Sequence, residues 1–163
     1  MKQRISSLLF TVAISAASVA AHAATPRQFD EQDRQEVKAV FLQQAAAATA
    51  HDMAAFERVF APTPAGQPDP VTFVARPYQF WGRPALIEHF NETFKGVWKF
   101  EPDAARVKVV PLTPDTAEIY APTQVTSGTS SETAKTAPFL VYEVAVRTPE
   151  GWRIAAIVPV PAQ

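Results

Sequence analysis

The distribution of proline limits what this chain can fold into. All 15 prolines lie beyond residue 25, and they recur at short intervals from residue 62 to residue 161. A proline inside a helix removes a backbone hydrogen bond and clashes with the preceding turn, so it breaks or kinks the helix. We therefore expect no long uninterrupted helix after about residue 61, and short elements separated by turns in the rest of the chain.

The first residues have the pattern of a secretory signal peptide. Lys2 and Arg4 give a positive start, residues 5–21 are mainly apolar, and Ala21-His22-Ala23 has small residues where a signal peptidase cuts. The apolar stretch is dotted with serines and shorter than the ~20 apolar residues of a membrane-spanning helix. We therefore predict that residues 1–23 are removed and leave no stable membrane anchor. Residues 24–163 would form one domain that is periplasmic or secreted.

Charge and cysteine content argue against several classes of partner and chemistry. The net charge is -1, and no basic run could follow a phosphate backbone, so nucleic acid is not an expected partner. The chain has no cysteine, which removes thiol nucleophiles, thiolate metal sites and thiol redox chemistry. His51 and His89 are isolated and form no metal-ligand signature, and the serines after residue 23 share one polar loop without a triad motif. We expect neither a metal nor an organic cofactor.

Hydrophobic periodicity predicts helices first and strands after them. Within residues 30–50, apolar side chains recur at helical spacing and predict a first helix. Asp52 can cap a second short helix. Gly82-Arg83-Pro84 opens a third helix, which ends near Gly96. Runs rich in β-formers predict strands at residues 71–75, 78–81, 105–112, 117–126, 139–148 and 152–160. Helices followed by an antiparallel meander indicate an α+β fold.

Two motifs stand out within this order of elements. Trp81-Gly82-Arg83-Pro84-Ala85-Leu86-Ile87 opens the third helix, and Gly151-Trp152-Arg153-Ile154-Ala155-Ala156-Ile157 begins the last strand. Over about residues 31–160 the chain resembles the nuclear transport factor 2-like superfamily, and within it the small bacterial SnoaL-like and ketosteroid-isomerase-like proteins. The resemblance implies a cone, in which a strongly curved, mostly antiparallel sheet wraps around about three N-terminal helices. It also implies a pocket at the open end and a homodimer formed through the outer sheet face.

Five aromatic residues are the candidates for binding a ligand in such a pocket. Tyr78 and Trp81 precede the third expected helix, at the expected mouth, where aromatic side chains can hold a flat apolar ligand. Trp152 lies on one face of the last strand, and Tyr120 lies on a strand face that could point into the cavity or toward a dimer contact. In strand 139–148, the apolar even-numbered positions are expected to face inward, which makes Tyr142 the fifth candidate.

A carboxylate base in the apolar cavity would point to an isomerase-type enzyme. Glu118 and Glu143 are the candidates, and we expect both to be exposed because unpaired acids are rarely buried. The last strand adds no acid or base: Val158, which alternation places on the face of Trp152, stands where relatives carry a histidine or another polar group. Catalytic residues therefore remain unassigned.

Three functions stay open at this stage. The favoured one is an exported homodimer that binds a small apolar ligand in the cone pocket. The second is a cofactor-free isomerase, cyclase or dehydratase-type enzyme that transfers a proton on an apolar carbonyl compound, and the third is a protein-interaction module. A carboxylate that faces the cavity, with its pKa raised by desolvation, would favour the enzyme.

Overall fold

The computed structural model describes residues 27–162, so the expected signal peptide at residues 1–23 lies outside the described part. The elements follow one another as α1 (Glu31–Ala50), α2 (Met53–Arg58), β1 (Thr72–Ala75), β2 (Tyr78–Trp81), α3 (Arg83–Thr93), β3 (Val97–Pro102), β4 (Lys108–Thr113), β5 (Thr116–Gly128), β6 (Lys135–Thr148) and β7 (Gly151–Pro161). After residue 61 the one helix in this region is α3, which has 11 residues, as the proline spacing predicts. No helix within these bounds is long and apolar enough to cross a membrane.

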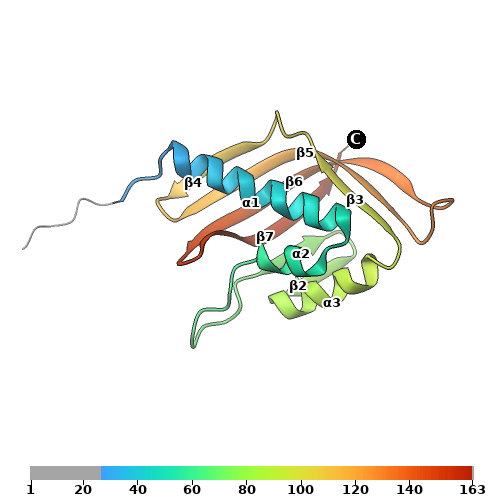
Figure 1. Ribbon diagram of the computed structural model, residues 1–163, viewed down its shortest axis with the longest axis horizontal. Coiled ribbons are helices and arrows are strands. Elements are labelled where there is room, and N and C mark those ends of the chain that lie inside the picture. The colour runs from blue at the N-terminus through green and yellow to red at the C-terminus, as the bar shows by residue number, and fades with distance from the viewer. Residues whose placement is uncertain (1–26, 163) are drawn as a thin grey trace, which may run out of the picture.

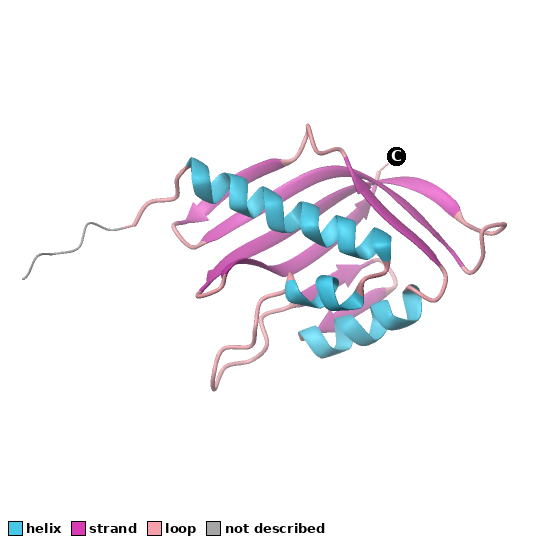
Figure 2. Cartoon of the chain, viewed as in Figure 1, coloured by secondary structure: helices cyan, strands magenta, loops and turns pink. Residues whose placement is uncertain are grey.

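The seven strands form one curved sheet with the order β2-β1-β7-β6-β5-β3, and β4 also pairs with β5. Neighbouring strands are antiparallel except for β1 and β7, which run parallel. Figure 1 shows α1 lying along one face of this sheet, with α2 and α3 beside β1 and β2. Figure 2 shows that the helices gather on this one side. The expected α+β fold, with a curved and mostly antiparallel sheet around N-terminal helices, is confirmed.

The helix ends follow the capping residues that the sequence offers. Asp30 and Asp33 form a reciprocal capping box at the beginning of α1, and His51 ends that helix in a left-handed conformation with φ 55°. Asp52 caps α2 by accepting a hydrogen bond from the Ala55 backbone. Each cap supplies hydrogen-bond partners for backbone groups that have none inside the helix. This explains why these helix boundaries could be predicted from the sequence.

Proline is tolerated within β5 because the strand changes partner there. Tyr120 is the last residue of β5 paired with β4, and Thr123 is the first paired with β3, so Pro122 lies between the two ladders. The missing N–H of Pro122 therefore removes no backbone hydrogen bond to β4 or to β3. The strand β3 itself was not predicted, and β5 and β6 extend beyond the predicted strands 117–126 and 139–148, to Gly128 and from Lys135.

A β-bulge decides which residues of β7 face the helices. Val144 pairs with Ala156 but Ala145 pairs with Ile154, so Ala155 is an extra residue in β7. One extra residue reverses the alternation beyond it, and Ile157 takes the buried face in place of Val158. The expected placement of Val158 on the cavity face is therefore wrong.

The two faces of β6 are also reversed relative to the prediction. Val141, Glu143 and Ala145 are fully buried under α1, and Tyr142 lies on the outer face. Both faces of this strand carry apolar residues, so hydrophobic alternation alone could not choose between them. The expectation that Tyr142 faces inward and Glu143 outward is wrong.

Candidate functional site

A cavity of about 260 Å³ lies where α1, α3 and the sheet meet. Its wall is mainly aromatic and aliphatic, which suits an apolar ligand. The side chains come from all three helices, from six strands that include β1 and β7, and from the turn between β1 and β2. They are Gln44, Ala48, Phe56, Phe73, Ala75, Arg76, Pro77, Tyr78, His89, Phe90, Trp98, Phe100, Val125, Ser127, Phe139, Ile157, Pro159 and Pro161.

His89 belongs to the aromatic wall of the cavity. Its ring stacks on Phe80 with a centroid distance of 4.6 Å and lies 4.8 Å from the ring of Tyr78. Burial lowers the pKa of His89 below its ordinary value of 6.5 because the charged imidazolium loses its hydration. The ring is therefore neutral at neutral pH, and it contributes a flat surface with at most one N–H donor.

A small number of polar atoms interrupt this apolar wall. The Trp98 Nε1 and the Gln44 Oε1 are both buried, and neither has a hydrogen-bond partner among the described residues. A buried polar atom without a partner costs about 1–3 kcal/mol. A ligand that satisfies such atoms would recover part of this free energy on binding.

Glu143 is a fully buried acid next to the cavity wall. Its side chain has no exposed surface, and Ile119 and Ile157 are its neighbours on the adjacent strands. Desolvation by burial raises the pKa of Glu143 to about 8, and the neighbouring Gln44 amide, which can donate to an ionised carboxylate, partly opposes this rise. The expectation that Glu143 is exposed is therefore wrong. Its carboxyl lies behind Gln44 and Ile157, which themselves line the cavity.

The structure distributes the five predicted ligand-binding residues over four regions. Tyr78 lines the cavity, whereas Trp81 is 68% exposed and lies outside it. Tyr120 and Tyr142 are cross-strand partners on the outer face of the sheet. Trp152 is buried at the beginning of α1, against Phe29 and Asp33.

The outer face also holds Glu118, the second candidate acid. The Tyr142 hydroxyl donates a hydrogen bond of 2.8 Å to its carboxylate. This bond raises the pKa of Tyr142 above 10.0, because removing the phenolic proton would break it. Glu118 is therefore hydrogen-bonded to Tyr142 on the side of the sheet opposite the cavity.

Sequence reasoning missed two wall residues, and it placed the candidate acid behind them, Glu143, on the exposed face. Gln44 is an amide within the apolar stripe of α1, and that interruption was the available signal. Trp98 lies in strand β3, which was not predicted. Glu143 gave no usable signal, because its face depends on how β6 packs under α1.

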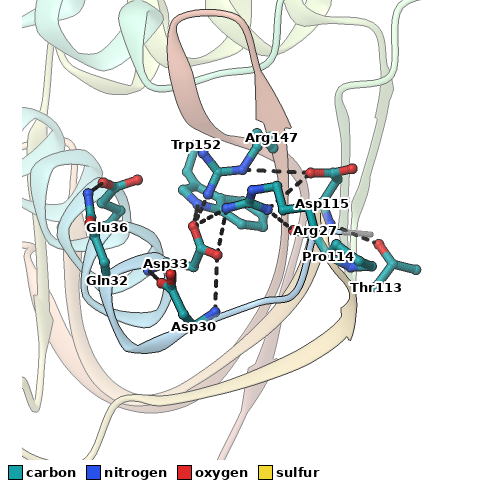
Figure 3. Close-up of polar contacts among 10 residues, drawn as sticks. All are labelled: Arg27, Asp30, Gln32, Asp33, Glu36, Thr113, Pro114, Asp115, Arg147 and Trp152. Atoms are coloured by element: carbon teal, nitrogen blue, oxygen red, sulfur yellow. Dashed lines mark hydrogen bonds and ion pairs between the residues drawn. The ribbon is translucent and has the colours of Figure 1, made fainter. Parts of the chain in front are cut away.

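A second polar cluster surrounds Asp33 and is shown in Figure 3. The carboxylate of Asp33 is buried and accepts hydrogen bonds from Arg27 at 2.6 Å, from Arg147, and from Trp152 Nε1 at 3.4 Å. The Arg147 guanidinium also lies 4.8 Å from the centre of the Trp152 ring. Asp33 precedes Gln44 by about three helical turns, or roughly 16 Å. The cluster therefore holds the elements together at the end of α1 remote from the cavity.

Comparisons with known proteins place this architecture. A family model for the SnoaL-like domain matches residues 37–158. A solved structure from Novosphingobium aromaticivorans, provisionally named an aromatic ring hydroxylase, is 17% identical, has a TM-score of 0.71, and covers 83% of this chain and 93% of that chain. One from Streptomyces avermitilis, provisionally named a dehydratase of the NTF2-like family, is 16% identical, has a TM-score of 0.67, and covers 80% of this chain and 97% of that chain.

A third solved structure has the same architecture. It is an NTF2-like protein with a cystatin-like fold from Novosphingobium aromaticivorans, 17% identical, with a TM-score of 0.62 and coverage of 81% of this chain and 83% of that chain. No curated protein matches the sequence. At these identities the structural likeness shows the fold alone.

Proposed function

Because the chain belongs to the SnoaL-like domain family of the nuclear transport factor 2-like superfamily, we propose that it binds a small, mainly apolar molecule in the cavity. The observation that carries the proposal is the cavity itself, with its aromatic wall and its unpartnered buried polar atoms. Its 260 Å³ would hold on the order of nine water molecules. This volume fits a compound of one or two rings.

Filling the cavity should abolish binding. Ala75 and Val74 are neighbours on β1, and Ala75 lines the cavity whereas Val74 points to the other face. The probe for this test is 2-acetylnaphthalene, an apolar ketone with two rings. Ala75→Trp places an indole in the ligand volume, so we expect the variant's affinity for this probe to be at least tenfold lower than that of the natural protein in a calorimetric titration. Val74→Trp, the matched control, should bind like the natural protein. Equal affinities of both variants would contradict the assignment of the site.

A buried acid favours a second candidate, the cofactor-free isomerase, cyclase or dehydratase-type enzyme. Glu143 has a pKa of about 8, which suits proton transfer near neutral pH. Its oxygen atoms are buried behind the cavity wall, however, and a general acid must reach its substrate. Ligand binding therefore remains the first proposal. Turnover of the recovered ligand that is lost in Glu143→Gln would favour the enzyme instead.

We further propose that the protein is exported and works as a homodimer. The apolar residues Val110, Leu112, Tyr120 and Val160 are exposed on the outer side of the sheet, as expected for a surface that another protein covers. A second copy is the proposed occupant, and a different protein on this face would support the interaction-module alternative.

Native mass spectrometry of protein from the cell envelope tests these proposals together. We expect chains that begin at Ala24, a mass of two chains, and an additional small-molecule mass. Val110→Asp, which introduces a charge into the outer face, should leave monomers because the carboxylate would lose its hydration in the dimer. A natural protein that retains residues 1–23 or stays monomeric would contradict the respective proposal.

A further inference from the structure

Gln44 is the polar side chain that connects the cavity to the buried acid. It lines the cavity, it is only 4% exposed, and its side chain faces the carboxyl of Glu143. The Gln44 Oε1 and both carboxyl oxygens of Glu143 are buried without a hydrogen-bond partner of good geometry in residues 27–162. All three atoms are acceptors unless Glu143 carries a proton. The pair therefore has two possible arrangements: the Gln44 NH₂ donates to an ionised Glu143, or a protonated Glu143 donates to the Gln44 Oε1. The charges around Glu143 decide between them.

The surroundings of Glu143 supply no charge that would keep it ionised. Ile119 of β5 and Ile157 of β7 flank it, and the buried residues of α1 next to Gln44 are apolar. The nearest charged residue on the same face of β6 is Arg147, four residues along the strand and paired with Asp33. Glu118 and the phenol of Tyr142 lie on the opposite face.

The cavity wall presents three further ionisable side chains. His89 of α3 is neutral, as shown above, Tyr78 begins β2, and Arg76 lies on the exposed turn between β1 and β2. None of them is the hydrogen-bond partner that the Glu143 carboxyl lacks. The acid is consequently neutral at neutral pH, in agreement with a pKa that burial raises to about 8.

We propose that the cavity selects ligands with an acceptor oxygen, of the ketone or ester carbonyl class, and that Glu143 is the positioning residue for this selection. Its acidic proton is donated to the Gln44 Oε1, which leaves the Gln44 side-chain NH₂ to point into the cavity as a donor. Trp98 Nε1, the other unpartnered polar atom in the wall, is also a donor. The unpaired groups of the wall thus match an oxygen with two lone pairs.

This inference rests on the proposed binding function, and a matched pair of probes separates the two. 2-Acetylnaphthalene and 2-isopropenylnaphthalene have nearly the same shape, but only the ketone offers an acceptor. At pH 6.5 we expect the ketone to bind about tenfold more tightly, since the olefin leaves buried donors unpaired. Both can be followed by calorimetry or by the fluorescence of Trp98 in the wall.

Two glutamines of α1 supply the variant and its control. Gln44→Leu should bind both probes with similar affinity, whereas Gln43→Leu, on the exposed side of the helix, should keep the tenfold preference. Equal binding of both probes by the natural protein would overturn the inference and leave the binding function intact. If neither probe binds, the proposed function fails together with the inference.

A pH series tests the positioning role of Glu143. When Glu143 ionises, its carboxylate accepts from the Gln44 NH₂, and the amide carbonyl turns toward the cavity. The preference of the natural protein for the ketone should therefore fall at least threefold between pH 6.5 and pH 9.5. In Glu143→Gln, which folds around the same volume without a titrating group, the preference should not change with pH. A natural protein with a flat profile, or a variant with the same slope, would overturn this role.

Discussion

The free energy of unfolding of this protein is expected to fall as the pH rises from about 4.5 to about 8, by as much as about 5 kcal/mol. Burial raises the pKa of Glu143 from its ordinary value of 4.5 to about 8. In this window the folded protein keeps a proton that the unfolded chain releases, so the unfolded state gains stability with each unit of pH. Each unit of pKa difference corresponds to 1.36 kcal/mol.

Glu143→Gln should remove this dependence. The amide has nearly the same size as the acid and never ionises, so the variant should be more stable than the natural protein by several kcal/mol at pH 9. Denaturant unfolding at a series of pH values measures the effect. Glu118→Gln on the outer face serves as the control and should keep the slope of the natural protein. Parallel profiles for the natural protein and Glu143→Gln would mean that Glu143 is already ionised in the fold.

The second large effect is expected at Asp33. Asp33→Ala should lower the free energy of unfolding by about 3 kcal/mol, because it removes the counter-ion of a partly buried cluster. Arg27 and Arg147 would then face each other without the carboxylate, and Trp152 Nε1 would lose its acceptor. Burial and the neighbouring Arg27 already lower the pKa of Arg147. The substitution also deletes the capping box at the beginning of α1.

The neighbouring Asp115 provides a matched control. It contacts the same two arginines, but its side chain is 63% exposed, so Asp115→Ala should cost less than about 1 kcal/mol. Thermal and denaturant unfolding of both variants compare the two carboxylates directly. Because the cluster is remote from the cavity, ligand affinity of folded Asp33→Ala should be unchanged. Similar losses at Asp33 and Asp115 would show that burial does not set the strength of these pairs.

Much of the architecture was predictable because local signals mark it. Asp30 and Asp52 cap their helices, Pro84 stands in the first turn of α3, and turn residues separate the later strands. These signals act through the backbone of a few neighbouring residues, so they need no tertiary information. Strand β3 escaped prediction because nothing within it marks a strand as clearly as its pairing with β5 does.

The candidate site was much less predictable. Of the five aromatic candidates, the structure brings only Tyr78 to the cavity wall, and the buried polar atoms there that lack a partner among the described residues belong to Gln44 and Trp98. The bulge at Ala155 reversed the inward face of β7, which no alternation pattern could anticipate. Both faces of β6 carry apolar residues, so its orientation depended on which set fits under α1.

The sequence by itself determined the α+β class, the helix boundaries and the limit on helix length, because capping and proline sterics are local properties of the chain. Only the tertiary structure decided which residues surround the cavity and that Glu143 is buried. Side-chain burial depends on strand register and on the packing of α1 against the sheet, and both are set by contacts between residues far apart in the sequence. The raised pKa of Glu143 follows from that packing.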